Sequence, residues 1–181
     1  AQALKKQYAE ASEEEKPGIE RAQDEIDGLV KAYQTDLIEQ HPNTFAAAVI
    51  KANMPFDMPE FEGATEEIKQ KKQLDWIRSH YFDNIDLSDP KMIRTPFFFE
   101  KVTYFLKSFY SPHPDSIGPA LTKVLDAMEP AEENFQFFLV HYLNEYAKSN
   151  IVGMDAVYVH LVDTYYATGR APWTDSDQLD K

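Results

Sequence analysis

The stretch WIRSHYFDNIDLSDPKMIRTP, residues 76–96, separates two long runs of helical sequence. Before it, apolar residues recur in steps of three and four from Thr65 onward, which predicts an amphipathic helix with a buried stripe of Leu74, Ile77, Tyr81 and Ile85. After it, Thr95 and Pro96 are a typical helix start, and a second stripe follows at Phe98, Val102, Phe105, Leu106 and Phe109. We therefore interpret the stretch as a joint that decides how two helical halves pack.

The rest of the chain also has helical periodicity. The pattern predicts one kinked helix or two within residues 2–40 with a break near Lys16, and later helices around 45–53, 65–85, 96–109, 114–128, 135–146 and 154–165. The prolines and the polar residues between these runs suit helix ends and caps, such as Asn43 or Thr44 before the second run. We predict an all-α fold of about seven to eight antiparallel helices in an orthogonal or repeat-like bundle, with no significant sheet.

The same pattern suggests a division into three parts. Residues 1–40 form an N-terminal linker helix or helices, 41–173 form a helical domain whose halves join near 83–96, and 174–181 begin a connection to a further domain. Helix-forming sequence at both ends of the chain favours this interpretation. We expect the chain to be a piece of a longer protein.

Composition excludes several classes of partner and chemistry. The formal net charge of -13 repels nucleic acid and anionic lipid, so we expect neither as a partner. No apolar run approaches the roughly 18 residues of a membrane-spanning helix, so this segment is not expected to insert into a membrane. The chain contains no cysteine, which excludes a disulfide or a thiol nucleophile within it.

Three closely spaced carboxylates in the joint are candidate cation ligands. Asp83, Asp86 and Asp89 could bind a hard metal, but the residues between them do not follow the spacing of a calcium loop. Ser88 or Asp89 is better placed to cap a short turn whose first helical residue is Pro90. We predict no metal site here.

The five histidines do not form a zinc pattern, and no catalytic motif is recognisable. His141 could pair with Glu145 and His160 with Asp163 along their own helices, or the two histidines could meet between the last two helices. The sequence leaves that choice open. We nominate no catalytic residue, no cofactor-binding residue and no cofactor.

An extended segment, MPFDMPEFEG at residues 54–63, alternates prolines with the apolar residues Phe56, Met58 and Phe61. It can be a plain linker crossing the surface. It can also be a peptide-like segment that mimics a ligand, because these apolar side chains are costly to leave in water.

Two stretches carry a family resemblance: HYFDNIDLSDPKMIRTPFFFEKV, residues 80–102, and NEYAKSNIVGMDAVYVHLVDTYYATGRAPW, residues 144–173. They resemble a helical domain of unknown function that precedes thioredoxin-like (AhpC/TSA, TlpA-like) domains in exported thiol-disulfide oxidoreductases of Gram-negative gut bacteria. The resemblance covers roughly residues 40–175. It implies a periplasmic or otherwise exported location and a downstream thioredoxin-like domain that holds the CxxC motif.

The resemblance implies no catalytic residue in this chain. We expect a non-catalytic accessory domain that positions or selects partners, including protein substrates, for the attached thioredoxin-like domain. Its candidate partner-contact surface is His80, Tyr81, Asp83, Asp86 and Asp89. The alternatives are a stand-alone helical-repeat-like module that binds a peptide or glycan, and a small-ligand binder or enzyme that uses Asp86 with His80 or Tyr81.

Overall fold

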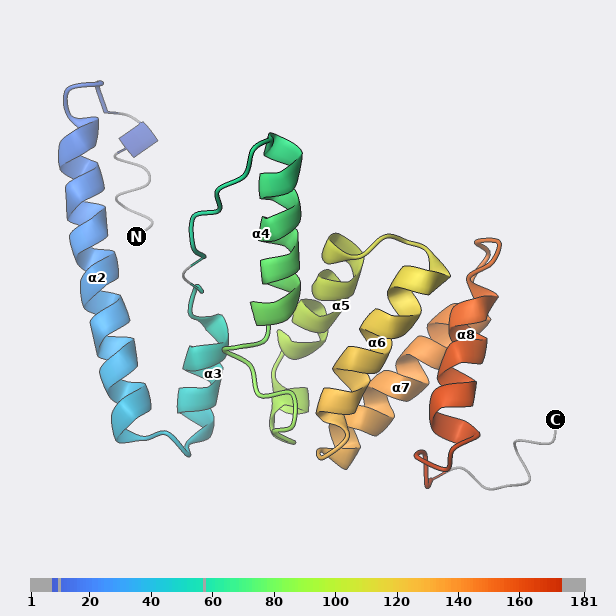
Figure 1. Cartoon of the computed structure of the whole chain (residues 1–181). Coiled ribbons are helices and arrows are strands. Elements are labelled where there is room, and N and C mark those ends of the chain that lie inside the picture. Colours follow the sequence, from blue (N-terminus) through green and yellow to red (C-terminus); the bar gives the residue numbers. More distant parts are fainter. Residues whose placement is uncertain (1–7, 10, 57, 174–181) are drawn as a thin grey trace. The chain divides into compact units, whose positions relative to one another are not determined.

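The computed structural model describes residues 8–9, 11–56 and 58–173, and the regular secondary structure in this part of the chain is all helical, with no strand (Figure 1). The predicted all-α fold class is confirmed. The elements are α2 (Lys16–Gln40), α3 (Phe45–Asn53), α4 (Glu66–His80), η1 (Met92–Arg94), α5 (Phe98–Phe109), α6 (Pro114–Met128), α7 (Glu132–Ala147), α8 (Asp155–Leu161) and η2 (Val162–Tyr166).

Several helices begin where the sequence indicates. Pro17 lies in the first turn of α2, where its missing N–H costs nothing, so the predicted break near Lys16 is confirmed. The hydroxyl of Thr44 accepts a hydrogen bond from the Ala47 amide (3.2 Å) and starts α3. In the same way the Thr65 hydroxyl caps α4 at the amide of Ile68 (3.3 Å).

Two predicted boundaries around the joint are wrong. Helix α4 ends at His80. Ile85 is buried, but it lies in the segment after the helix and is not part of the apolar stripe of α4. Thr95 does not cap α5, because its hydroxyl donates to the carbonyl of Met92 at 2.7 Å and closes the short helix η1. Helix α5 then begins at Phe98 without a side-chain cap.

The last predicted helix is divided. α8 is regular to Leu161 and continues as a single π-helical turn, η2. The hydroxyl of Thr164 donates to the His160 carbonyl at 2.6 Å. This side-chain donor can satisfy the carbonyl where the regular pattern of backbone N–H donors changes. Gly169 lies in the turn that follows η2 and, at φ +73°, has the left-handed conformation that glycine adopts without strain.

The chain forms two compact units, residues 1–55 and 56–181. In the first unit, α3 packs on α2. In the second, α6, α7 and α8 each contact the other two and α5 packs on α6, around a core that includes Phe98, Phe105, Leu121, Phe138 and Leu161.

The three-part division at residues 40 and 173 stays a prediction, and residues 174–181 lie outside the described residues. None of the described helices is both long and apolar enough to span a membrane.

Candidate functional site

His80 and Tyr81, at the end of α4, belong to an aromatic cluster on the surface of the second unit. The His80 ring stacks on Trp76, one helical turn earlier, with ring centroids 4.4 Å apart and planes within 10° of parallel. Its Nδ1 lies 2.9 Å from the Trp76 carbonyl oxygen, so Nδ1 carries a proton and Nε2 is left for another partner. Both side chains are half-buried.

The extended segment after residue 55 contributes its apolar side chains to this cluster. Phe56 packs on Trp76 and Tyr81 at centroid distances of 5.7 and 6.5 Å. The ring of Phe61 also packs on Trp76, at a centroid distance of 6.3 Å. Phe56 keeps 39% of its surface exposed and Met58 keeps 42%. The segment therefore lies against α4 through its apolar residues and presents part of them to solvent.

Tyr81 connects the surface cluster to the core. Its ring contacts Phe105 and Phe109 of α5 at 5.0 and 5.5 Å. Burial raises the pKa of the Tyr81 hydroxyl above its ordinary value, with a smaller contribution from Tyr104. The phenol is therefore neutral at physiological pH and can donate a hydrogen bond.

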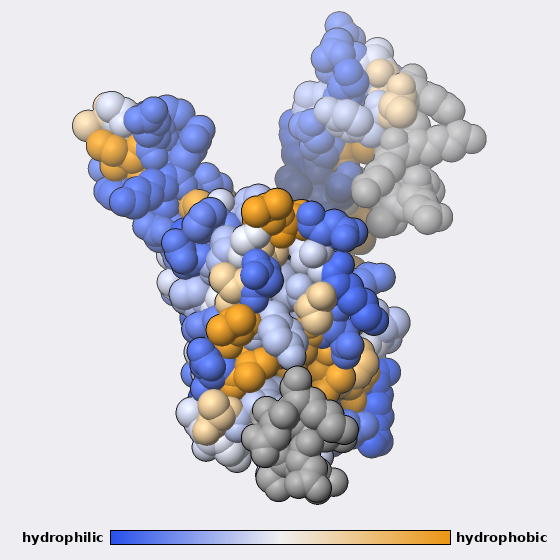
Figure 2. All heavy atoms as spheres, turned by 90° about the vertical axis from the view of Figure 1, so that its right-hand side faces the viewer, coloured by the Kyte–Doolittle hydropathy of each residue, from blue (hydrophilic) through white to orange (hydrophobic). Residues whose placement is uncertain are grey.

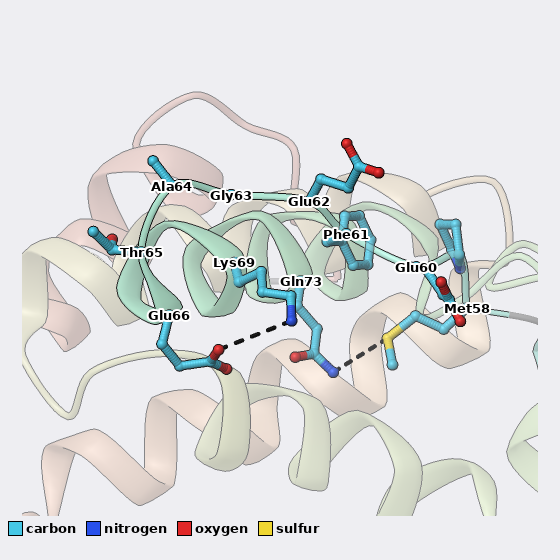
Figure 3. Close-up of a pocket in the computed structure, with 11 residues that line it drawn as sticks. Met58, Glu60, Phe61, Glu62, Gly63, Ala64, Thr65, Glu66, Lys69 and Gln73 are labelled. Carbon is cyan, nitrogen blue, oxygen red and sulfur yellow. Dashed lines mark hydrogen bonds and ion pairs between the residues drawn. The ribbon is translucent and has the colours of Figure 1, made fainter.

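A surface hollow of about 810 Å³ lies between the extended segment and the first half of α4 (Figure 3). Its polar side chains make weak contacts with each other: Lys69 lies 3.9 Å from Glu66, and the Gln73 amide lies 3.5 Å from the sulfur of Met58. Glu60 and Glu62 are exposed at its edge. The hollow is suited to a ligand that combines cationic or amide groups with an apolar part.

The three aspartates of the joint have separate roles. One Asp86 oxygen accepts from the amide and the hydroxyl of Ser88 at 2.9 and 2.6 Å. Asp89 accepts from the Lys91 amide at 2.9 Å and so caps the turn at Pro90 as predicted, but the helix η1 begins only at Met92, so Pro90 is not its first helical residue. Asp83 is exposed. Among the described residues no three histidine or carboxylate side chains are close enough to hold a metal ion.

The two histidines of the C-terminal helices have different surroundings. His141 Nε2 lies 3.4 Å from Glu145, so the predicted pairing along α7 is confirmed. The predicted pairing of His160 with Asp163 is wrong, because His160 Nε2 lies 2.8 Å from the Thr122 hydroxyl on α6. His141 contacts Glu145 and neighbouring aromatic rings, whereas His160 contacts Thr122, so they share no partner, which argues against a site between them.

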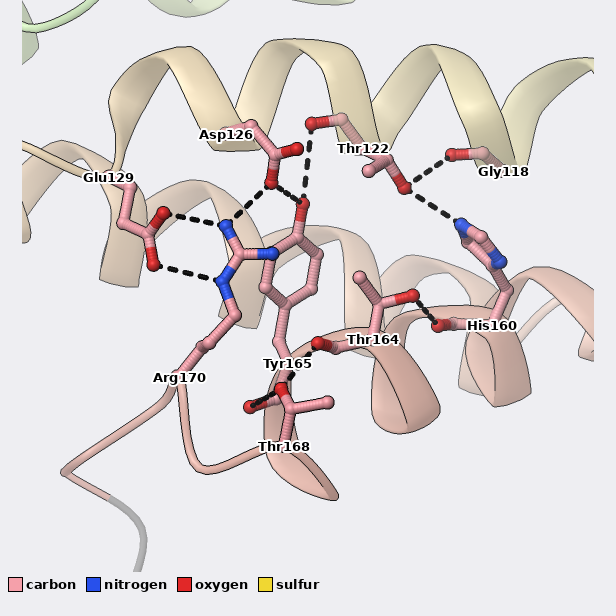
Figure 4. A network of polar contacts seen from close by, with 9 residues as sticks. All are labelled: Gly118, Thr122, Asp126, Glu129, His160, Thr164, Tyr165, Thr168 and Arg170. Carbon is pink, nitrogen blue, oxygen red and sulfur yellow. Dashed lines mark hydrogen bonds and ion pairs between the residues drawn. The ribbon is translucent and has the colours of Figure 1, made fainter.

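Sequence reasoning missed a polar network that attaches the C-terminal segment to α6 (Figure 4). Arg170 donates two hydrogen bonds to Glu129, at 2.9 and 2.6 Å, and one to Asp126 at 2.8 Å. Tyr165 donates to the same Asp126 oxygen at 2.9 Å. The hydrogen bonds from Arg170 lower the pKa of Glu129. The partners are 39 to 44 residues apart, so no local pattern could have indicated them.

Exposed apolar side chains also occur elsewhere on the second unit. Figure 2 shows apolar side chains interspersed with polar ones on the face that includes α8. The most exposed near that helix are Ile151 (64%), Val152 (100%) and Val159 (52%). They lie on a turn and a short helix.

Comparison with known proteins identifies a family without an assigned activity. The family described as "Domain of unknown function (DUF5106)" matches residues 22–181. No curated protein and no solved structure matches the chain.

Proposed function

Since the chain belongs to the DUF5106 family, a domain of unknown function, we propose that it acts as a non-catalytic interaction domain. In this proposal it positions or selects protein partners for a thioredoxin-like domain of the same protein. The observation that carries the proposal is the half-exposed aromatic cluster of Phe56, Phe61, Trp76, His80 and Tyr81 beside the hollow at α4. Aromatic side chains next to a recess are typical centres of protein-binding surfaces.

In this proposal the thiol chemistry belongs to another domain of the protein. This chain contains no cysteine, so it cannot exchange disulfides itself. The hydrogen-bonded ion pairs of Arg170 with Asp126 and Glu129 attach the C-terminal segment to α6, which is a structural role. The thioredoxin-like partner domain and the exported location are supported by the family resemblance of residues 80–102 and 144–173.

The partner is expected to approach from the aromatic side of the joint. Asp83 and Asp86 follow Tyr81 closely in the chain and are exposed, so a basic group on the partner can pair with them at the rim. The core of the contact is then aromatic and the rim acidic. This arrangement favours protein substrates with an apolar residue next to lysine or arginine.

A redox assay of the longer protein that contains this chain tests the proposal. Phe56→Asp should lower turnover of protein disulfide substrates about tenfold or more, since it removes an aromatic contact, and leave turnover of a small disulfide unchanged. Phe137→Asp is the matched control, because Phe137 is an exposed aromatic residue of α7 far along the chain from the cluster. Equal turnover of protein substrates by wild type and Phe56→Asp would refute the proposal.

A stand-alone module that binds a peptide or glycan is the second candidate. The hollow favours it, since Phe61 supplies an apolar surface and Glu60, Lys69 and Gln73 supply hydrogen-bonding groups. The mutual packing of α6, α7 and α8 counts against an open stack of helical repeats. Titration of the isolated chain with basic peptides and oligosaccharides, followed by chemical-shift changes around Lys69 and Gln73, separates the candidates. Binding that needs no second domain would favour this one.

A further inference from the structure

The middle of α2 carries large apolar side chains that no described part of its own unit covers. Exposed fractions are 41% for Ile26, 66% for Leu29, 48% for Val30 and 69% for Tyr33. Helix α2 has 25 residues and none of them is buried. At about 100° per residue, Ile26, Leu29 and Tyr33 lie within about 60° of each other and form one stripe.

The two flanks of this stripe differ. On one flank Gln34 and Ile38 are half-buried, and α3 packs on α2. On the other flank Arg21, Glu25, Asp36 and Glu39 are all exposed. The stripe is therefore open toward the flank that carries these charges.

We propose that this stripe is the contact between two copies of the chain, with the two α2 helices packed antiparallel about a two-fold axis near Leu29. In that register Leu29 faces Leu29 of the second copy, and Ile26 faces Tyr33. Like flanks meet in an antiparallel pair, so Arg21 of each copy lies opposite Asp36 of the other. Two opposite-charge pairs then border an apolar seam.

The charges select this arrangement over the alternatives. In a parallel pair the charged flank of one helix meets the glutamine-bearing flank of the other, so Asp36 has no opposite charge to face and Glu25 lies against Val30. Only Arg21 would find an opposite charge there, at Asp27. A uniformly basic partner would place a like charge against Arg21, and a uniformly acidic partner would place like charges against Glu25 and Asp36. A second copy offers both signs at matching positions.

Oligomeric state is measured by sedimentation velocity over a range of concentrations. A single helix pair is a small interface, so we expect a reversible dimer with a dissociation constant on the order of 10 µM. Leu29→Glu or Tyr33→Glu should weaken it by more than about tenfold. Because both residues are exposed on a helix, the circular dichroism of the variants should remain that of the wild type.

A charge exchange tests the register. Arg21→Asp and Asp36→Arg should each weaken the dimer about tenfold, since each places like charges opposite each other. The double variant should restore the affinity to within about threefold. If both single variants bind like the wild type, the antiparallel register is wrong.

Cysteine cross-linking adds an independent test, because the wild-type chain has no cysteine. Leu29→Cys should form an intermolecular disulfide on mild oxidation, since the two thiols meet at the axis. Ala22→Cys, on the same helix, should not, because its two copies would be about 20 Å apart. Cross-linking of both variants indicates a parallel pair, and a monomeric wild type at every concentration indicates that another part of the same chain covers the stripe. Either result overturns the proposal.

Discussion

The side-chain amide of Asn134 on α7 donates a hydrogen bond to the backbone carbonyl of Asp89, 2.9 Å away and 45 positions earlier in the chain. The same Nδ2 atom also donates to the carbonyl of Leu87 at 3.2 Å. Asn134 is fully buried. One side chain therefore satisfies two carbonyls of the joint and attaches it to the C-terminal helices.

Asn134→Ala should destabilise the protein by about 1 to 3 kcal/mol, because it leaves buried carbonyls without a donor. Urea unfolding measures the change. The matched control is Asn144→Ala on the same helix, whose amide donates to the Val140 carbonyl at the exposed surface. That variant should change stability by less than about 0.5 kcal/mol. Equal losses in the two variants would mean that Asn134 does not hold the joint.

Adjacent phenylalanines on α7 should respond very differently to truncation. Phe138 is fully buried and packs on Phe98 at a centroid distance of 5.4 Å, whereas Phe137 is 46% exposed. Phe138→Ala should cost about 3 to 5 kcal/mol, since it removes buried surface and leaves a cavity. Phe137→Ala should cost less than about a third of that. Denaturant unfolding of both variants checks the orientation of α7, and a larger loss for Phe137 would contradict it.

Gly118 in α6 should be intolerant of a methyl group. A Cβ at this position would lie 3.1 Å from the Cδ2 atom of His160. Gly118→Ala, which would gain up to about 1 kcal/mol in an open helix, should therefore destabilise the wild type. In the His160→Ala background the same change should stabilise the protein. A thermal-unfolding cycle measures the reversal of sign, and a stabilising effect in both backgrounds would show that the contact is not tight.

Replacement of Arg170 should cost more than replacement of a comparable surface arginine. Arg170→Gln breaks the paired hydrogen bonds to Glu129 and the bond to Asp126, so we expect a loss of about 1 kcal/mol. Arg94→Gln is the control, because Arg94 makes a single, largely exposed contact of 3.4 Å with Glu133. Chemical denaturation at neutral pH compares them, and equal effects would contradict the special role of Arg170.

The contribution of Arg170 should also depend on pH. Its hydrogen bonds hold the pKa of Glu129 below the ordinary value of 4.5. A carboxyl with a lowered pKa in the folded state stabilises the protein fully above its unfolded pKa and loses that contribution as the pH falls through the folded value. The stability difference between wild type and Arg170→Gln should therefore be constant near neutrality and shrink below about pH 4.5. Urea midpoints measured at falling pH test this, and a pH-independent difference would contradict it.

Features that depend on neighbours three or four residues apart can be predicted from the amino-acid sequence alone. The caps at Thr44 and Thr65, the proline in the first turn of α2 and the hydrogen bond from the Lys91 amide to Asp89 are all local, so a pattern along the chain reveals them. The helical class of the fold follows from the same short-range periodicity.

Contacts between groups that are distant in the chain depend on how the helices pack. His160 bonds to Thr122 and not to the nearby Asp163, and Arg170 reaches Glu129 across 41 positions, because the packing of α8 on α6 brings these side chains together. The partners of Phe56 are Trp76 and Tyr81, because the extended segment lies against this part of α4. The sequence alone does not indicate which of the aromatic rings near α4 Phe56 contacts. Such choices depend on how helices pack in three dimensions, which the spacing of residues along one helix does not specify.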